Sequence, residues 1–290
     1  MISFYVMKKK VPVRDKYSVS IIITSKTEGD VIKALLLSAT NQTYKNIEVI
    51  LVDNNSTDNT LKIAKEFKKV KIYNFGPERS AQRNYGAKKS KGKYLLFLDA
   101  DMKLTQRVVE ECVEKINSGK KIGGIAIPEE SVAHSFWEKV KSFERSFYNE
   151  NGDPITDAAR FFPKEIFEKA GGYDETITGP EDWDLPETIR EMGYKTDRIN
   201  EKIYHKERAT SLRSLFKKKF YYGLHAHKYL QKHNISLVSP KTVYFLRPLF
   251  YKSWRRLVSH PMLALGMIIM LFTQTLGGGL GYIVGRLKRF

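Results

Sequence analysis

Residues 94–101, YLLFLDAD, place an apolar run directly before Asp99, Ala100 and Asp101. A short apolar run of this kind indicates a strand that is buried on both faces of a parallel sheet. In such sheets ligands bind at the carboxyl ends of the strands, where the two aspartates lie. Hard divalent cations prefer carboxylate oxygens, and a cation held by one or two carboxylates keeps positions open for substrate phosphates. The stretch therefore favours a metal-assisted nucleotide diphosphate site, whereas a turn or a helix cap is the plainer interpretation of an aspartate pair.

Three more apolar runs precede this strand, and a helical pattern follows each of them. Strand and helix alternate with short connections, which predicts a doubly wound, mainly parallel α/β sheet. Polar residues at the carboxyl ends of the first two strands, Thr24 to Glu28 and Asp53 to Asp58, should then lie near Asp99 and Asp101. Strands are predicted over residues 18–24, 47–52 and 70–73. Helices are predicted over residues 30–40 and 78–90, and another follows the loop 54–58 and ends at Phe67.

The pattern is looser after residue 101. Gly171-Gly172 indicates a tight turn that needs positive φ and close packing. Helices are predicted over residues 106–117, 134–149 and 184–192, and strands over 122–127, 158–162, 195–198 and 202–205.

Charge divides the chain into two parts. The 290 residues carry a net charge of +18, with 42% hydrophobic side chains, which excludes a disordered or uniformly membranous chain. Residues 1–207 contain 35 basic and 32 acidic side chains, whereas residues 208–290 contain 15 basic side chains and no acidic one. A nearly neutral catalytic domain (1–207) and a basic helical region (208–290) are therefore predicted, and the excess charge indicates a polyanionic or membrane partner.

The single cysteine, Cys112, excludes an internal disulfide framework and a cysteine-based zinc site. The apolar stretch within Met1 to Arg14 is too short for a signal peptide, so residues 1–207 are expected in the cytoplasm.

Several motifs give the chain a resemblance to a known family over residues 18–206. It resembles the inverting GT-A glycosyltransferases of family 2, a group that includes polyprenol-phosphate mannosyl- and glucosyltransferases. The motifs are SVSIII at 18–23, NQTYKNIEVILVDNNSTDNT at 41–60, QRNYGAKKSKGKYLLFLDAD at 82–101, FFPKEIFEKAGGYDE at 161–175 and EDWDL at 181–185. The resemblance implies a GT-A fold and a nucleotide diphosphate sugar as donor.

The resemblance also implies roles for particular residues. Asp53 would bind the base, Asp99 the ribose or the metal, and Asp101 the Mn²⁺ or Mg²⁺ that bridges the diphosphate. Asp182 of the Glu181-Asp182 pair would be the general base, and Arg83 would lie near the sugar or Asp99. An inverting transfer needs such a base and cationic stabilisation of the departing diphosphate.

The first strand departs from the family pattern, Pro-x-(aromatic)-Asn-Glu, because residues 24–28 read Thr-Ser-Lys-Thr-Glu. Thr24, Lys26 and Glu28 are expected near the nucleotide, with Lys26 as an added cation or a solvated loop residue. The choice between a uridine and a guanosine donor stays open.

Other site residues carry two interpretations each. His205 matches a position where many relatives place a metal ligand, but a lone histidine is often a packing residue. Glu181 and Asp182 can be helix caps, and Asp184 competes with Asp182 for the role of base. Asp157 and Arg160 either face the acceptor or form a surface pair.

Residues 208–260 mix 12 lysines and arginines with ten aromatic residues. A helix from Pro248 would place Leu249, Phe250, Trp254 and Leu257 opposite Lys252, Arg255 and Arg256, which is typical of an interfacial helix. Basic residues beside aromatics also suit single-stranded nucleic acid. The uncharged segment that follows favours a membrane over nucleic acid as the partner.

Residues 261–285 contain no charge, and as a helix they would extend roughly 37 Å against a hydrocarbon core of about 30 Å. Gly277-Gly278-Gly279 is expected to interrupt this helix. Basic clusters on both sides of the segment favour a helical hairpin, a re-entrant segment or an in-plane helix over a single span. A buried helix or an oligomer interface is the alternative without a membrane.

The sequence thus predicts a metal-dependent, inverting hexosyltransferase that moves a sugar from a UDP- or GDP-sugar to a lipid or lipid-linked acceptor. It would work at the cytoplasmic face of the membrane, bound to anionic lipids, without nucleic acid. A polysaccharide- or glycan-extending transferase, a non-catalytic nucleotide-sugar or nucleic-acid binder, and a sugar-nucleotide pyrophosphorylase are the alternatives. The pyrophosphorylase lacks support because no Gly-rich phosphate loop follows the first strand.

Overall fold

The computed structural model describes residues 16–119, 121–150, 152–153, 157–208 and 211–288. The prediction for Met1 to Arg14 lies outside these residues.

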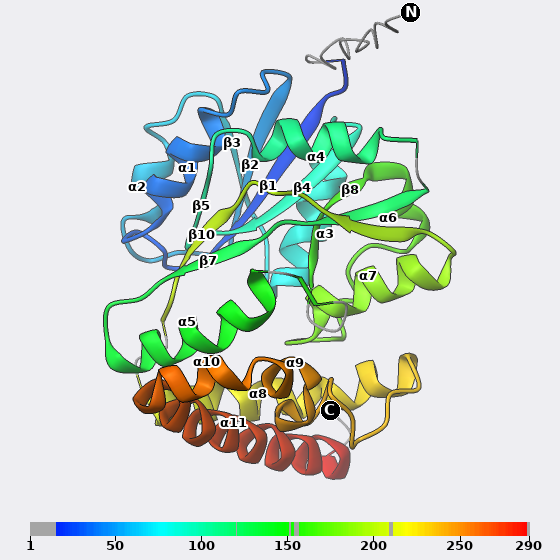
Figure 1. Ribbon diagram of the computed structural model, residues 1–290. Helices are drawn as coiled ribbons and strands as arrows, with labels where there is room; N and C mark the ends of the chain where they lie inside the picture. Colours follow the sequence, from blue (N-terminus) through cyan, green and yellow to red (C-terminus); the bar gives the residue numbers. More distant parts are fainter. Residues whose placement is uncertain (1–15, 120, 151, 154–156, 209–210, 289–290) are drawn as a thin grey trace, which may run out of the picture.

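A seven-stranded sheet in the order β3-β2-β1-β4-β8-β6-β9 forms the centre of the molecule (Figure 1). β1, β2, β3 and β4 are parallel to one another, and β8 is antiparallel to both of its neighbours, β4 and β6. The mainly parallel α/β sheet is therefore confirmed. Its strands are β1 (Val19–Ser25), β2 (Ile47–Asp53), β3 (Val70–Asn74), β4 (Tyr94–Asp99), β6 (Ile122–Ala126), β8 (Ala159–Pro163) and β9 (Lys195–Arg198).

Alternate side chains of β1 enter two separate cores, as expected for a sheet covered on both faces. Ile21 and Ile23 pack with α1, α2 and α4, whereas Ile22 packs with α3, α6 and α7. The helices are α1 (Ile32–Thr40), α2 (Thr60–Ala64), α4 (Val108–Ile116), α3 (Arg79–Lys89), α6 (Lys164–Lys169) and α7 (Glu181–Glu191).

Strand register sets the polar ends side by side. Thr24 pairs with Asp99, and the next residue, Ser25, pairs with Asp53. The carboxyl ends of three strands thus lie at one edge of the sheet, as the sequence predicts.

A second sheet, in the order β5-β10-β7, was not predicted in full. Its strands are β5 (Met102–Leu104), β7 (Glu129–Val132) and β10 (Ile203–Lys206). β5 has only three residues and β7 reads EESV, which is mostly polar, so neither shows the apolar pattern of a strand. Sequence analysis found only β10, displaced by one residue.

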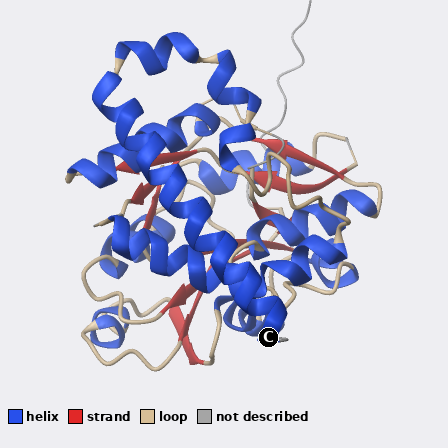
Figure 2. Cartoon of the chain, turned by 90° about the horizontal axis from the view of Figure 1, so that it is seen from below, coloured by secondary structure: helices blue, strands red, loops and turns tan. Residues whose placement is uncertain are grey.

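The C-terminal helices form a layer below the sheet, seen from the side in Figure 1 and from below in Figure 2. A third core joins this layer to α5 through Val140, Phe147, Leu215, Phe250 and Met270. The helices of this part are α5 (Phe136–Asn149), α8 (Leu212–Lys232), η1 (Tyr244–Leu246), α9 (Pro248–Lys252), α10 (Trp254–Ser259) and α11 (Pro261–Lys288).

α11 is one continuous helix, so the predicted interruption at Gly277–Gly279 and the helical hairpin are wrong. Glycine recurs every fourth residue on the face that meets α8, and a Cβ at Gly277 would lie 2.7 Å from the carbonyl oxygen of Phe216. Gly281 and Gly285 meet α8 in the same way. Close backbone contact therefore compensates for the low helix propensity of glycine.

The predicted helix from Pro248 is divided at Ser253 into α9 and α10. Phe250 is buried in the protein, whereas Trp254 is 57% exposed. The predicted single helix with both side chains on one face is therefore wrong, because the helix is interrupted between them at Ser253.

Candidate active site

A cavity of about 430 Å³ lies between the carboxyl ends of the strands and the C-terminal helices. The ends of β1 and β4 and the loops that follow them contribute Thr24, Lys26, Glu28 and residues 99–101, all of them predicted site residues. The helical layer contributes Lys218, Lys219 and Tyr222 from α8 and Gln274 from α11, none of which the sequence analysis assigned to the site.

Arg83 joins two predicted site carboxylates, Asp99 and Asp182. Its Nη1 donates to Asp182 Oδ1 at 2.6 Å, and its Nη2 donates to Asp99 Oδ1 at 2.9 Å. The guanidinium is fully buried and lies over the ring of Tyr173, 4.9 Å from the centroid. Arg83 thus fixes Asp182, in the first turn of α7, against the end of β4.

Asp99 also faces a second arginine. Arg160 Nη1 lies 3.5 Å from Asp99 Oδ2, and the same guanidinium binds Glu129 through Nε and Nη2. Burial alone would raise the pKa of Asp99, but Arg83 and Arg160 hold that pKa well below its usual range. Asp99 is therefore ionised and bound between arginines.

The second sheet brings His205 to Asp101. β10 pairs with β5, and the amide of Lys206 donates to the carbonyl of Asp101. His205 Nε2 lies 3.4 Å from Asp101 Oδ2, and Nδ1 lies 3.0 Å from Glu129 Oε2. Burial and Arg145 would lower the pKa of His205, but the two carboxylates outweigh them and raise it to about 9.

The contacts of Asp99, Asp101 and His205 show which of these predicted metal ligands is free to bind a cation. Asp101 Oδ1 is buried without a hydrogen-bond partner, as suits a carboxylate oxygen that meets a cation. Within the part of the chain that the structure describes, no cluster of three metal-ligating side chains is present. Asp101 fits a divalent cation, whereas Asp99 is bound to arginines and His205 to carboxylates, so their roles as ligands stay predictions.

Glu181 is placed differently from Asp182. Its side chain is 2% exposed, binds Arg79 at 2.7 Å and accepts from the amide of Gly179. Burial raises the pKa of Glu181 although Arg79 opposes it. Gly179 has a φ of +104°, and a Cβ there would lie 2.6 Å from the ring of Tyr222. Glu181 therefore holds the loop before α7 and does not line the cavity.

Asp53 also lies outside the cavity. It is fully buried and accepts from the hydroxyl of Ser25 at 2.7 Å and from the amide of Ser56 at 2.8 Å. These contacts shape the loop beside the cavity. A direct contact between Asp53 and the base stays a prediction.

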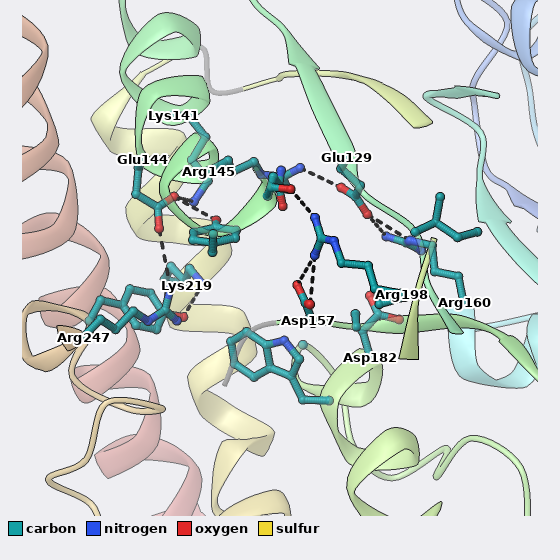
Figure 3. A pocket seen from close by; sticks show the side chains of 18 residues that line it. Glu129, Lys141, Glu144, Arg145, Asp157, Arg160, Asp182, Arg198, Lys219 and Arg247 are labelled. Carbon is teal, nitrogen blue, oxygen red and sulfur yellow. Dashed lines mark hydrogen bonds and ion pairs between the residues drawn. The ribbon is translucent and has the colours of Figure 1, made fainter. Parts of the chain in front are cut away.

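A second cavity of about 200 Å³ adjoins the first, and Asp182, Arg160 and Lys219 line both (Figure 3). Asp157 points into it and binds Arg198 at 2.7 Å. Asp157 therefore pairs with Arg198, and Arg160 pairs with Glu129, so the two do not form the predicted surface pair. A role of Asp157 toward the acceptor stays a prediction.

Asp184 is excluded from the cavities by its own partners. It is 1% exposed and binds Lys232 at 2.9 Å and His233 at 2.8 Å, at the end of α8. Asp184 ties α7 to the helical layer. Asp182 is therefore the carboxylate of this helix that faces the site.

Sequence analysis missed Glu129, Arg145 and Arg208 as well as the residues of α8 and α11. Arg208 binds Glu28 at 2.5 Å and lies 3.7 Å from Asp101, and Arg145 binds Glu129 and Glu207. Their positions follow from β7, β10 and α5 meeting in space, for which the sequence carries no local signal. Arg79 could have been predicted from the sequence, because it lies four residues before Arg83 and therefore on the same face of the predicted helix.

Comparison with known proteins settles the family. Residues 20–171, just over half of the chain, match Glycosyl transferase family 2. The chain belongs to this family. Its Asp99-Ala100-Asp101 turn, Arg83 and all of β1 except Val19 lie inside the matched region, whereas Asp182, His205 and all of α8 to α11 lie beyond it.

Two bacterial relatives of this family 2 member are similar over different lengths. An Escherichia coli enzyme, UDP-Glc:alpha-D-GlcNAc-diphosphoundecaprenol beta-1,3-glucosyltransferase WfaP, is 42% identical over 29% of this chain and 35% of its own length. An uncharacterized glycosyltransferase of Haemophilus influenzae is 30% identical over 66% of this chain and 70% of its own. The chain thus spans only about a third of the first relative.

Solved structures share the fold of this family 2 protein. The mannosyltransferase PcManGT from Pyrobaculum calidifontis, in complex with GDP-Man and Mn²⁺, superposes with a TM-score of 0.61 at 16% identity, over 94% of this chain and 86% of its own. S. aureus TarS in complex with UDP-GlcNAc gives a TM-score of 0.54 at 15% identity, over 93% and 92%. These likenesses establish the GT-A fold.

Proposed function

We propose that this family 2 protein transfers a hexose, with inversion, from a UDP- or GDP-sugar to a lipid-linked acceptor at the cytoplasmic face of a membrane. The observation that carries the proposal is the buried Arg83, which joins Asp99 at the strand end to Asp182 in the cavity. Relatives and neighbours with nucleotide-sugar ligands and a diphosphoundecaprenol-linked acceptor support it.

Asp182 is the general base in this proposal. Its carboxylate takes the proton of an acceptor hydroxyl while that oxygen bonds to the anomeric carbon and the bond to the diphosphate oxygen breaks. Arg83 orients the carboxylate, and the first turn of α7 stabilises its charge. If the attacking group is a phosphate, it is already ionised, and Asp182 positions it.

The departing diphosphate needs positive charge. Arg208 lies 3.7 Å from Asp101 and lines the same cavity, so it can bind a phosphate oxygen. Asp101, through its unpartnered Oδ1, would hold Mn²⁺ or Mg²⁺, and Asp99 and His205 stand beside it. A bound cation supplies Lewis-acid stabilisation of the leaving group.

The membrane contact falls to α11, the one helix among the described residues that is long and apolar enough to cross a membrane. One face of α11 packs on α5 and α8 along its length, while Leu265, Phe272 and Ile283 are among its exposed side chains. A spanning α11 would take the lysines of α8 into the hydrocarbon, at high cost. We therefore place α11 in the plane of the interface.

Exposed groups on the neighbouring helices fit the same surface. Tyr251 and Trp254 are 64% and 57% exposed, and aromatic rings of this kind favour the headgroup region. Lys252 and Arg255 are exposed beside them and suit anionic headgroups.

The function is tested by transfer. Full-length protein is incubated with Mn²⁺, one donor at a time (UDP-glucose, UDP-N-acetylglucosamine or GDP-mannose), and vesicles that contain N-acetylglucosaminyl diphosphoundecaprenol. We expect nucleotide release coupled to glycosylation of the lipid, abolished by Asp101→Asn and retained in Glu165→Gln, a surface control. Nucleotide binding without turnover for every donor and acceptor would identify a non-catalytic binder instead.

The membrane contact has its own test. Phe272→Asp should reduce cosedimentation with phosphatidylglycerol vesicles, because it places a charge on the exposed face of α11. Leu37→Asp is the matched control, since Leu37 is an exposed apolar residue on α1. Equal binding by both variants and the wild type would contradict the proposed surface.

A further inference from the structure

Among the residues that the structure describes, the side-chain amide of Gln274 has no hydrogen-bond partner. It lies on the face of α11 that packs against the domain and is 2% exposed, yet neither Nε2 nor Oε1 has a hydrogen-bond partner among the described residues. A buried amide without a partner is destabilising and rare in native proteins. Because Gln274 lines the active-site cavity, a ligand is the partner that the cavity can supply.

Lys218 and Lys219 line the same cavity from α8. Two arginines of this cavity each have a carboxylate partner in the protein: Arg145 binds Glu129 and Glu207, and Arg208 binds Glu28. For the two lysines, no carboxylate of the described chain lies within ion-pair distance; Lys219 instead donates to the hydroxyl of Tyr244 at 2.8 Å. Two ammonium groups thus face the cavity without an anion.

The pKa of Lys218 agrees with this excess of positive charge. The Lys218 side chain is exposed to solvent, but desolvation where it lines the cavity lowers its pKa, and nearby cations lower it further, to about 8. The cations are Arg79 on α3, Lys219 on α8, and Arg145 and Lys141 on α5. An anion bound at Lys218 would relieve this repulsion.

The three groups share the cavity with Asp99 and Asp101 but enter it from the opposite layer. The two aspartates, expected at the donor, come from the strand ends, whereas the lysines and the glutamine come from helices beyond residues 20–171. Lys219 also lines the second cavity together with Asp182 (Figure 3). The opposite face of α11 is exposed and apolar, so a lipid at this subsite has its chain near the membrane.

We propose that Lys218, Lys219 and Gln274 form the subsite for the phosphate or diphosphate group of the lipid-linked acceptor. The inference rests on the proposed function. The ammonium groups bind phosphate oxygens, and the amide N–H of Gln274 donates to another oxygen of the same group. The C-terminal helices therefore select an anionic acceptor as well as contacting the membrane.

Binding to the full-length chain in detergent micelles tests the subsite. The probes are farnesyl diphosphate, farnesol, and UDP and GDP, each nucleotide with Mn²⁺. The double variant Lys218→Ala/Lys219→Ala and the single variant Gln274→Leu should each weaken farnesyl diphosphate binding by about tenfold or more, as loss of a charged hydrogen bond does. Lys217→Ala, an exposed neighbour outside the cavity, should change nothing.

Nucleotide and farnesol affinities should stay within about twofold of wild type in all variants, because these probes do not use the subsite. Gln274→Leu should also melt no lower than wild type, since it removes an unsatisfied buried amide. Loss of binding without loss of stability is a readout that a structural role cannot give.

Several results would overturn the inference. These are weaker UDP or GDP binding with unchanged farnesyl diphosphate binding, equal losses for farnesol, no loss in any variant, or no farnesyl diphosphate binding by the wild type. A lower melting temperature for Gln274→Leu would overturn the part assigned to Gln274. Failure of the proposed function is distinguishable, because the wild type would then transfer no sugar, with or without nucleotide binding, whereas the binding of farnesyl diphosphate tests the subsite by itself.

Discussion

Replacing Arg83 with methionine should destabilise the protein strongly, because it leaves two carboxylates facing each other without their shared cation. Removing one partner of a buried ion pair costs about 3–5 kcal/mol. Asp182 and Asp99 keep side-chain exposures of 25% and 19%, and Asp99 retains Arg160 at 3.5 Å. We therefore expect the lower end, about 3 kcal/mol, or about 6 °C in Tm for a chain of this size.

The assay is reversible urea unfolding, run as a double-mutant cycle. Adding Asp182→Asn to Arg83→Met should restore about 1–2 kcal/mol, because the uncompensated charge is removed, while activity stays absent. Lys169→Met is the control, since its partner Glu165 is also exposed, and its urea midpoint should match the wild type. A loss below about 1 kcal/mol for Arg83→Met, or strict additivity in the cycle, would refute the role of Arg83 as the buried link.

Three further predictions concern the metal, the helix contact and pH. Asp101→Asn should abolish the stimulation of transfer by Mn²⁺ while nucleotide binding without metal persists; an unchanged metal response measured by titration would contradict the role of Asp101. Gly281→Leu should destabilise by about 3 kcal/mol in thermal or urea unfolding, because its side chain meets the backbone of α8, whereas Gly279→Leu should be neutral or slightly stabilising, since a Cβ there meets nothing within 4 Å. The KM for the acceptor should rise as the pH passes about 8, where Lys218 loses its proton, and Lys218→Arg should flatten that rise; the same pH profile in both proteins would exclude Lys218 as the titrating group.

Local patterns in the sequence were sufficient for the main sheet. The β-branched and apolar runs of β1, β2 and β4 are long and buried on both faces, so composition alone marked them, and the register then placed Thr24 beside Asp99. The short strands β5 and β7 have no comparable signal, although they bring His205 to Asp101.

The C-terminal helices could not be predicted from local sequence patterns alone. A Gly-Gly-Gly sequence predicts a break, because glycine is a poor helix former, yet close packing on α8 keeps α11 continuous through it. Gln274 is a single polar residue inside the apolar run of α11, and no sequence pattern marks it as a site residue. It lines the cavity only because α8, α11 and the strand ends enclose the same space.

The role of Asp182 as the base of an inverting transfer is tested by the anomeric configuration and rate of sugar transfer to a membrane-embedded acceptor, compared between wild type and Asp182→Asn. We expect a product of inverted configuration, read by NMR, and a fall in kcat of about 10²–10⁴-fold in the variant, with its fold and nucleotide affinity preserved. Retention of configuration, or undiminished transfer by Asp182→Asn, would contradict this role.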